Sequence, residues 1–171
     1  MSNTRRLTKM ALLTALLCIS AYISFPLPFT PAMVTALTLV ATLIGLLLSP
    51  KDAFIVLIVY VLLGAIGLPV YAGGTAGMGK LFGPTGGFII SWPIAYTLLS
   101  YLKGAKRSFF QYTWRSIVIT MPIVYAFGMA SFMLVANMSF EKAFIGAVLP
   151  FIPGDVIKCI VASWLAIKIK I

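Results

Sequence analysis

Long apolar runs separated by short polar or proline-rich connections are the first feature of this 171-residue chain. A helix that crosses a lipid bilayer needs about 20 predominantly apolar residues. Six runs come close to that length, and proline or glycine stands at many of their boundaries. The pattern predicts an all-α membrane protein with one domain over residues 1–171 and six transmembrane helices, approximately at 7–25, 32–49, 53–70, 84–102, 115–136 and 147–168.

The composition supports lipid as the solvent for most of the surface. Hydrophobic residues make up 61% of the chain and charged residues only 9%, whereas soluble domains carry about 25% charged residues. The mean hydropathy of +1.09 agrees. We therefore expect a multi-pass protein embedded in the bilayer.

The positive charges predict the orientation of the helices. The net charge of +10 could suggest nucleic acid, but the cations stand at the ends of apolar runs and form no basic patch with interleaved aromatics, so no nucleic-acid partner is expected. With the N-terminus inside, the outer connections carry Lys80 and Lys142, and Lys158 falls in the sixth run. The inner side carries the other ten: Arg5, Arg6, Lys9, Lys51, Lys103, Lys106, Arg107, Arg115, Lys168 and Lys170. This bias predicts cytoplasmic N- and C-termini.

The supply of reactive side chains is small. The chain has no histidine and three acidic residues, and its two cysteines, Cys18 and Cys159, lie in apolar runs. These residues offer no metal-ligand spacing and no cluster for acid–base chemistry. We therefore expect no catalytic residues, no metal and no cofactor, and a membrane lipid-modifying enzyme is a disfavoured alternative.

A glycine-rich connection joins the third and fourth runs. GLPVYAGGTAGMGKLFGPTGG, from Gly67 to Gly87, holds eight glycines in 21 residues. Its segment GTAGMGK nearly matches a phosphate-binding loop, but Leu81 replaces the required Ser or Thr, membrane helices flank it, and it faces outward. We interpret the stretch as an outer loop that folds back into the bundle and offers N–H groups to a ligand, with a flexible connector as the alternative.

The sequence PGDVIK places two ionisable residues near the outer end of the sixth run. Asp155 and Lys158 share a helix face at a spacing of three. Ionisable groups within a membrane cost at least about 2.5 kcal/mol each on insertion scales and usually serve a function. The alternative is a structural ion pair. With aromatic walls, such a site suits a small, mostly apolar molecule that carries an anionic group and N–H donors; the candidate walls are Tyr71, Phe82, Phe88, Trp92 and Tyr125.

The first run carries a small-residue face. Ala11 and Ala15, in ALLTA, are spaced by four and would let another helix approach closely. Such a face is common in apolar helices, and taken alone it favours packing within the chain.

GLPVYAGGTAGMGKLFGPTGGF together with PFIPGDVIK closely resembles the BioY family. Members are the biotin-binding S-components of energy-coupling factor (ECF) transporters. The resemblance implies a six-helix protein of the bacterial plasma membrane that binds biotin from outside and delivers it with a transmembrane T-component and two cytoplasmic ATPase subunits. It implies no enzymatic activity in this chain, with biotin as transported ligand.

The resemblance also implies which residues act. It places Tyr71, Gly73, Gly74, Asp155 and Lys158 in the substrate site, and Ala11 and Ala15 on the surface that docks the T-component. Our hypothesis pairs Lys158 with the valerate carboxylate of biotin and Asp155 with the ureido N–H groups.

Two positions depart from the family pattern. Members often read P-x-T-x-Q where this chain reads Pro31-Ala-Met-Val-Thr35, so the contact of that glutamine is in doubt and Thr35 is a possible replacement. Lys80 has no firm counterpart and is either a second partner for the carboxylate or a solvated loop lysine. A carrier for another small vitamin, within an ECF complex or alone, is the alternative to a biotin S-component.

Overall fold

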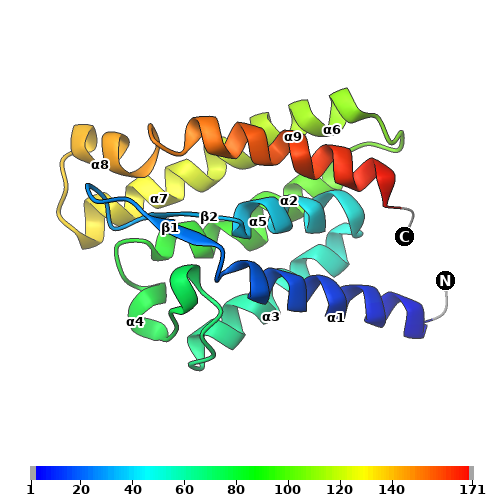
Figure 1. Ribbon diagram of the computed structural model, residues 1–171, viewed down its shortest axis with the longest axis horizontal. Helices are drawn as coiled ribbons and strands as arrows, with labels where there is room; N and C mark the ends of the chain where they lie inside the picture. Colours follow the sequence, from blue (N-terminus) through cyan, green and yellow to red (C-terminus); the bar gives the residue numbers. More distant parts are fainter. Residues whose placement is uncertain (1–2, 170–171) are drawn as a thin grey trace.

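The computed structural model describes residues 3–169, and most of them are helical. The first residues of α1 (Asn3–Ser20) and the last residues of α9 (Ile152–Lys168) lie at one end of the molecule, and α4 (Met78–Leu81) and α8 (Phe140–Ala147) lie at the other (Figure 1). The elements in chain order are α1 (Asn3–Ser20), β1 (Ser24–Pro26), β2 (Met33–Thr35), α2 (Leu37–Leu47), α3 (Pro50–Ala65), the 3₁₀ turn η1 (Ala72–Gly74), α4 (Met78–Leu81), α5 (Gly86–Leu102), α6 (Phe109–Arg115), the π-helical turn η2 (Ser116–Thr120), α7 (Met121–Val135), α8 (Phe140–Ala147) and α9 (Ile152–Lys168).

The helical character of the chain is confirmed, while six crossings of a bilayer stay a prediction. Within residues 3–169, the continuous helix Phe109–Val135 is long and apolar enough to span a membrane, with 27 residues and a mean hydropathy of 2.0. The pair α8 and α9 qualifies together but bends by 42° between its two parts. Helices α2 and α5 are apolar but shorter. Lys170, counted above among the inner cations, lies outside the described residues.

The first predicted helix ends earlier, and the second begins later, than the apolar runs 7–25 and 32–49 suggested. Helix α1 ends at Ser20 and α2 begins only at Leu37, because residues 24–26 and 33–35 pair as an antiparallel ribbon. Three prolines in the intervening segment, Pro26, Pro28 and Pro31, lack the N–H that a helix needs and favour this extended course. The ribbon lies over the end of the bundle that carries α4 and α8 (Figure 1).

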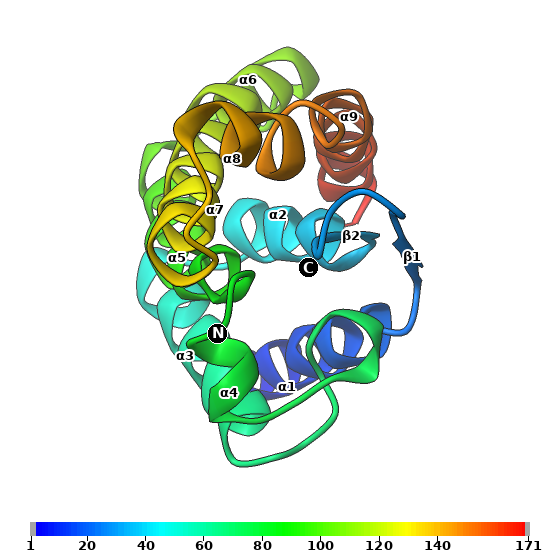
Figure 2. The ribbon, with the colours of Figure 1, turned by 90° about the vertical axis from the view of Figure 1, so that its left-hand side faces the viewer.

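Helix α2 is the centre of the bundle. It packs against α9, α5 and α1, and Figure 2 shows it between α9 on one side and α1 and α3 on the other. Eight of its eleven residues are buried, as expected for a helix that is apolar on all sides. Lys103, at the end of α5, donates from Nζ to the carbonyl oxygens of Gly45 (3.2 Å) and Leu48, and so satisfies acceptors at the C-terminus of α2.

Glycine allows α5 and α7 to pack closely. A Cβ atom on Gly87 of α5 would lie 2.1 Å from the carbonyl oxygen of Phe127, and one on Gly128 of α7 would lie 2.3 Å from the ring of Phe88. The two helices therefore touch through their backbones. The GPTGG motif, singled out above as part of a ligand loop, is also the packing surface that brings α7 to α5.

The glycine-rich connection is folded and not a flexible linker. Gly73 N–H donates to the carbonyl oxygen of Ala21 at the end of α1 (3.1 Å), and Gly77 N–H donates to that of Gly64 in α3 (2.7 Å). The Tyr71 ring packs directly on Gly64, and its hydroxyl donates to the carbonyl oxygen of Val61 (2.6 Å). These bonds fix the connection to two helices.

An ion pair joins α1 to the start of α3. Ser49 caps α3 by accepting from the N–H of Asp52 (3.3 Å), a favoured arrangement at a helix N-terminus. The Asp52 carboxylate in turn accepts from Nε of Arg6 (2.8 Å) and from its Nη2. The hydrogen bond from Arg6 holds the pKa of Asp52 below its usual 3.8, although partial burial acts in the opposite direction.

Substituting Gly87 with alanine should destabilise the protein. The added Cβ meets backbone, which cannot rotate away, so α5 and α7 must separate at a cost of about 1–3 kcal/mol. Gly154→Ala is the matched control, because nothing lies within 4 Å of a Cβ there and alanine favours the helix. Thermal unfolding in detergent measures both, and an unchanged midpoint for Gly87→Ala contradicts the packing described.

The Asp52 pair should make stability depend on acid pH. Because the folded pKa of Asp52 is depressed, its stabilisation is present above the unfolded pKa of about 4 and is lost as pH falls through the folded pKa. Asp52→Asn should therefore reduce the fall in unfolding midpoint between neutral pH and about pH 3. Glu141→Gln, which removes an exposed acid with no ion pair within residues 3–169, should leave that fall unchanged.

Candidate functional site

A cavity opens at the end of the bundle opposite the termini. It is lined from β2, from the starts of α2, α5 and α9, from α7 and from the glycine-rich connection. Its volume, including the open solvent at its mouth, is about 670 Å³. The cavity brings Lys80 together with two predicted site residues from a distant part of the sequence, Asp155 and Lys158.

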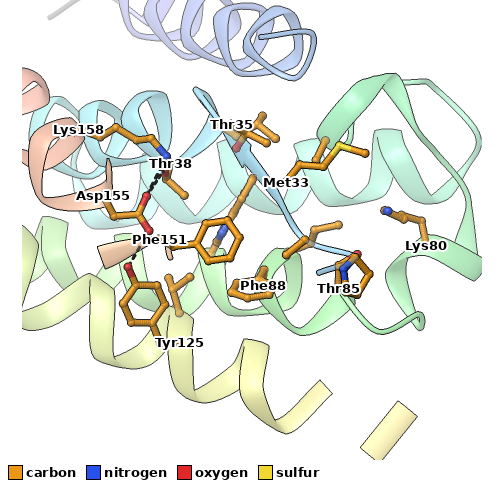
Figure 3. A pocket seen from close by; sticks show the side chains of 17 residues that line it. Met33, Thr35, Thr38, Lys80, Thr85, Phe88, Tyr125, Phe151, Asp155 and Lys158 are labelled. Carbon is orange, nitrogen blue, oxygen red and sulfur yellow. Dashed lines mark hydrogen bonds and ion pairs between the residues drawn. The ribbon is translucent and has the colours of Figure 1, made fainter. Parts of the chain in front are cut away.

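A hydrogen-bonded cluster occupies one side of the cavity (Figure 3). Asp155 Oδ1 accepts from Lys158 Nζ (2.9 Å) and from the Thr38 hydroxyl (3.2 Å). Its Oδ2 accepts from the Tyr125 hydroxyl (2.8 Å), and Lys158 Nζ also donates to Thr38 Oγ1 (3.1 Å). Three helices, α2, α7 and α9, thus hold one carboxylate.

The ion pair is largely buried but reaches the cavity. The side chains of Asp155 and Lys158 are 12% and 16% exposed, and both line the wall. A buried ion pair seldom stabilises a protein more than apolar packing of the same volume. The position on the cavity wall therefore favours a role in binding, and the two charges are already bonded to each other before any ligand is considered.

Aromatic side chains form the apolar walls, only partly as expected. Phe88, Trp92 and Tyr125 line the cavity, and Trp92 stacks on Tyr60 with ring centroids 5.5 Å apart. Two other candidates lie elsewhere: the Tyr71 ring is buried against Gly64, and Phe82 is 63% exposed outside the lining.

The structure adds lining residues that the sequence did not reveal. Phe151, in the turn before α9, faces Phe88 at a centroid distance of 6.4 Å. Thr38 shares a face of α2 with Thr42 at a spacing of four, which is a detectable polar signal in an otherwise apolar helix. Neither position could be assigned to a site without knowing that α2 and α9 are neighbours.

The predicted loop contacts fall into two groups. Lys80 lines the cavity, and its ammonium has no hydrogen-bond or ion-pair partner among residues 3–169. Gly73 and Gly74 lie outside the lining, where Ala72 is the contributor from that segment. Both adopt positive φ (72° and 70°) and pack near Met33 and Tyr22, so they shape the wall, and direct contact with a ligand stays a prediction for them and for Tyr71.

Ala11 and Ala15 lie away from the cavity. They are exposed on α1, on the side opposite the buried residues Met10, Leu13 and Leu17. No helix within the described part of the chain covers them, so that face is open. No group of three or more histidine, cysteine or acidic residues that could hold a metal occurs among residues 3–169.

Comparison with known proteins gives concordant results. The family model described as the BioY family matches residues 1–171. The probable biotin transporter BioY of Bacillus subtilis is 36% identical over 164 residues, covering 93% of this chain and 87% of that protein. The biotin transporter BioY of Thermotoga maritima is 34% identical over 166 residues, covering 97% and 96%. A crystal structure of the S-component for biotin from an ECF-type ABC transporter superposes with a TM-score of 0.91 and 27% identity, covering 98% of this chain and 93% of that one.

Removing one partner of the Asp155–Lys158 ion pair should lower the free energy of unfolding more than removing both charges. Lys158→Met leaves the Asp155 carboxylate without its cation and should lower the free energy of unfolding by up to about 3 kcal/mol, since the cavity admits some water. The double variant Asp155→Asn/Lys158→Met should recover most of that loss. Chemical unfolding of the ligand-free protein measures both variants and the single variant Asp155→Asn, and a loss in the double variant equal to the sum of the two single losses would show that the pair is not coupled.

Proposed function

The chain belongs to the BioY family, and we propose that it is the biotin-binding S-component of an ECF transporter. Its relatives are named as biotin transporters, and the matching crystal structure is an S-component for biotin. The chain is accordingly a transport protein and not an enzyme. Its ligand is cargo, so no cofactor is required.

The observation that carries this proposal is the composition of the cavity. Biotin is a compact bicycle with polar ureido N–H and C=O groups, an apolar thioether ring and a flexible acid tail. The cavity offers the Asp155–Lys158 cluster, apolar walls from Phe88, Trp92 and Phe151, and a separate cation, Lys80. A mainly apolar pocket with a few convergent polar groups is the usual form of a small-molecule site.

The proposal includes a membrane topology. We take residues 1–171 as one domain with six spans in the plasma membrane of a bacterial cell and with both termini cytoplasmic. The shared position of the two termini, and the cavity at the far end, support this arrangement (Figure 1). The cavity then opens to the outside, where biotin is captured.

Delivery requires partners. We assign the exposed Ala11 and Ala15 face of α1 to docking of a T-component, with two ATPase subunits supplying energy to the complex. Small residues at this spacing let a second helix approach closely in lipid, and the described structure leaves the face uncovered.

Equilibrium binding to the detergent-purified chain tests the proposal. Biotin should bind at micromolar concentration or below, and Asp155→Asn should weaken binding about tenfold or more, because a charged acceptor is replaced by a neutral one. Glu141→Gln, an exposed acid outside the cavity, is the matched control and should bind normally. Absence of biotin binding by the folded wild-type chain, with binding of another small vitamin, would overturn the assignment of substrate.

A further inference from the structure

We infer that biotin binds with its ureido ring at the Asp155–Lys158 cluster and its carboxylate at Lys80, on the other side of the cavity. The inference rests on the proposed function and specifies how the ligand is oriented. It replaces the pairing of Lys158 with the carboxylate that the sequence suggested. The evidence is the number of hydrogen bonds that the cluster still has available and the position of a second cation.

The two charged groups of the cluster have one acceptor position and one N–H donor left. A carboxylate offers about four lone-pair positions, and Asp155 already uses three of them for Lys158, Thr38 and Tyr125. The position that remains is on Oδ2. The ammonium of Lys158 has three N–H donors and spends two on Asp155 and Thr38.

One acceptor beside one donor complements the edge of a cyclic urea. In such a ring an N–H and the C=O point to the same side, so the N–H can donate to Asp155 while the oxygen accepts from Lys158. Thr35 also lines the cavity, its side chain makes no hydrogen bond within residues 3–169, and it is available for the second N–H. A carboxylate ligand at this place would instead lie against the carboxylate of Asp155, and like charges at contact repel strongly.

A ligand carboxylate at Lys80 would not lie against an acidic side chain. Lys80 projects from α4 toward the cavity and lies with Thr85 on the side away from the cluster (Figure 3). Its ammonium has no partner among residues 3–169, and neither Asp52 nor Glu141 lines the cavity. A half-buried cation without a counterion is a ready partner for an anion. The walls between the two polar places are apolar and aromatic, as the thioether ring and the alkyl tail require.

The glycine-rich connection thereby gains a specific task. Its residue Lys80 binds the carboxylate of the tail, while Asp155 and Lys158 of α9 bind the ureido ring. Recognition of the two ends of the ligand is separable, because the residues concerned share no hydrogen bond in the described structure.

Paired ligands test the inference. Affinities of biotin and of biotinamide, whose tail is neutral but whose ring is identical, are compared in the wild type, in Lys80→Met and in Lys80→Arg. Lys80→Met should weaken biotin about 10- to 100-fold and change biotinamide less than about threefold. Lys80→Arg should restore most of the affinity for biotin, since it returns the charge. Lys142→Met, on the exposed surface of α8, is the matched control and should leave both ligands unaffected.

The ring side is tested with the double variant Asp155→Asn/Lys158→Met, which contains no unpaired charge. It should weaken biotin and biotinamide by similar factors. Equal binding of biotin by Lys80→Met and the wild type, or a double variant that weakens biotin alone, would overturn the inference while leaving the proposed function intact. A wild-type chain that binds neither ligand would instead overturn the proposed function.

Discussion

A carboxylate inside an apolar bundle has to be neutralised and hydrogen-bonded, and this requirement organises the binding end of the protein. Asp155 meets it with one donor from each of α2, α7 and α9. Burial of an unpaired charge would cost several kcal/mol, so these three helices share a fixed relation at the level of the cavity. The close contact of α5 with α7 through Gly87 and Gly128 then brings the aromatic wall against the same cluster.

The glycine-rich connection completes the cavity by a different kind of interaction. It has few side chains to bury, so backbone hydrogen bonds to Ala21 and Gly64 and the packing of Tyr71 hold it in place. Positive φ at Gly73 and Gly74 lets the chain turn tightly enough to present Ala72 to the cavity. Tyr71 and the two glycines therefore lie behind the cavity wall, and Lys80 is the charged residue of the connection that lines the cavity.

Much of the fold could be predicted from the period and length of the apolar runs, because lipid and core both demand apolar helices. The ribbon at residues 24–26 and 33–35 could not, since its pairing depends on where α1 and α2 lead the chain. Within the site, Asp155, Lys158 and Lys80 were identifiable because charge is conspicuous in an apolar sequence. Phe151 and Thr38 were not, because aromatic and threonine residues are common in such helices and only tertiary contact distinguishes them. The same limit explains why Tyr71 and Phe82 were expected on the cavity wall and lie outside its lining.

Helix α1 bears on the cavity although it contributes no lining residue. Its first turns are tied to α3 through Arg6 and Asp52, and the chain directly after its last turn accepts the N–H of Gly73, next to the wall residue Ala72. Displacement of α1 is therefore opposed at its start by the Arg6–Asp52 ion pair and just after its end by the hydrogen bond from Gly73 to Ala21. A change in the tilt of α1 would therefore act on both contacts, and through Gly73 it would act on the segment that carries the wall residue Ala72.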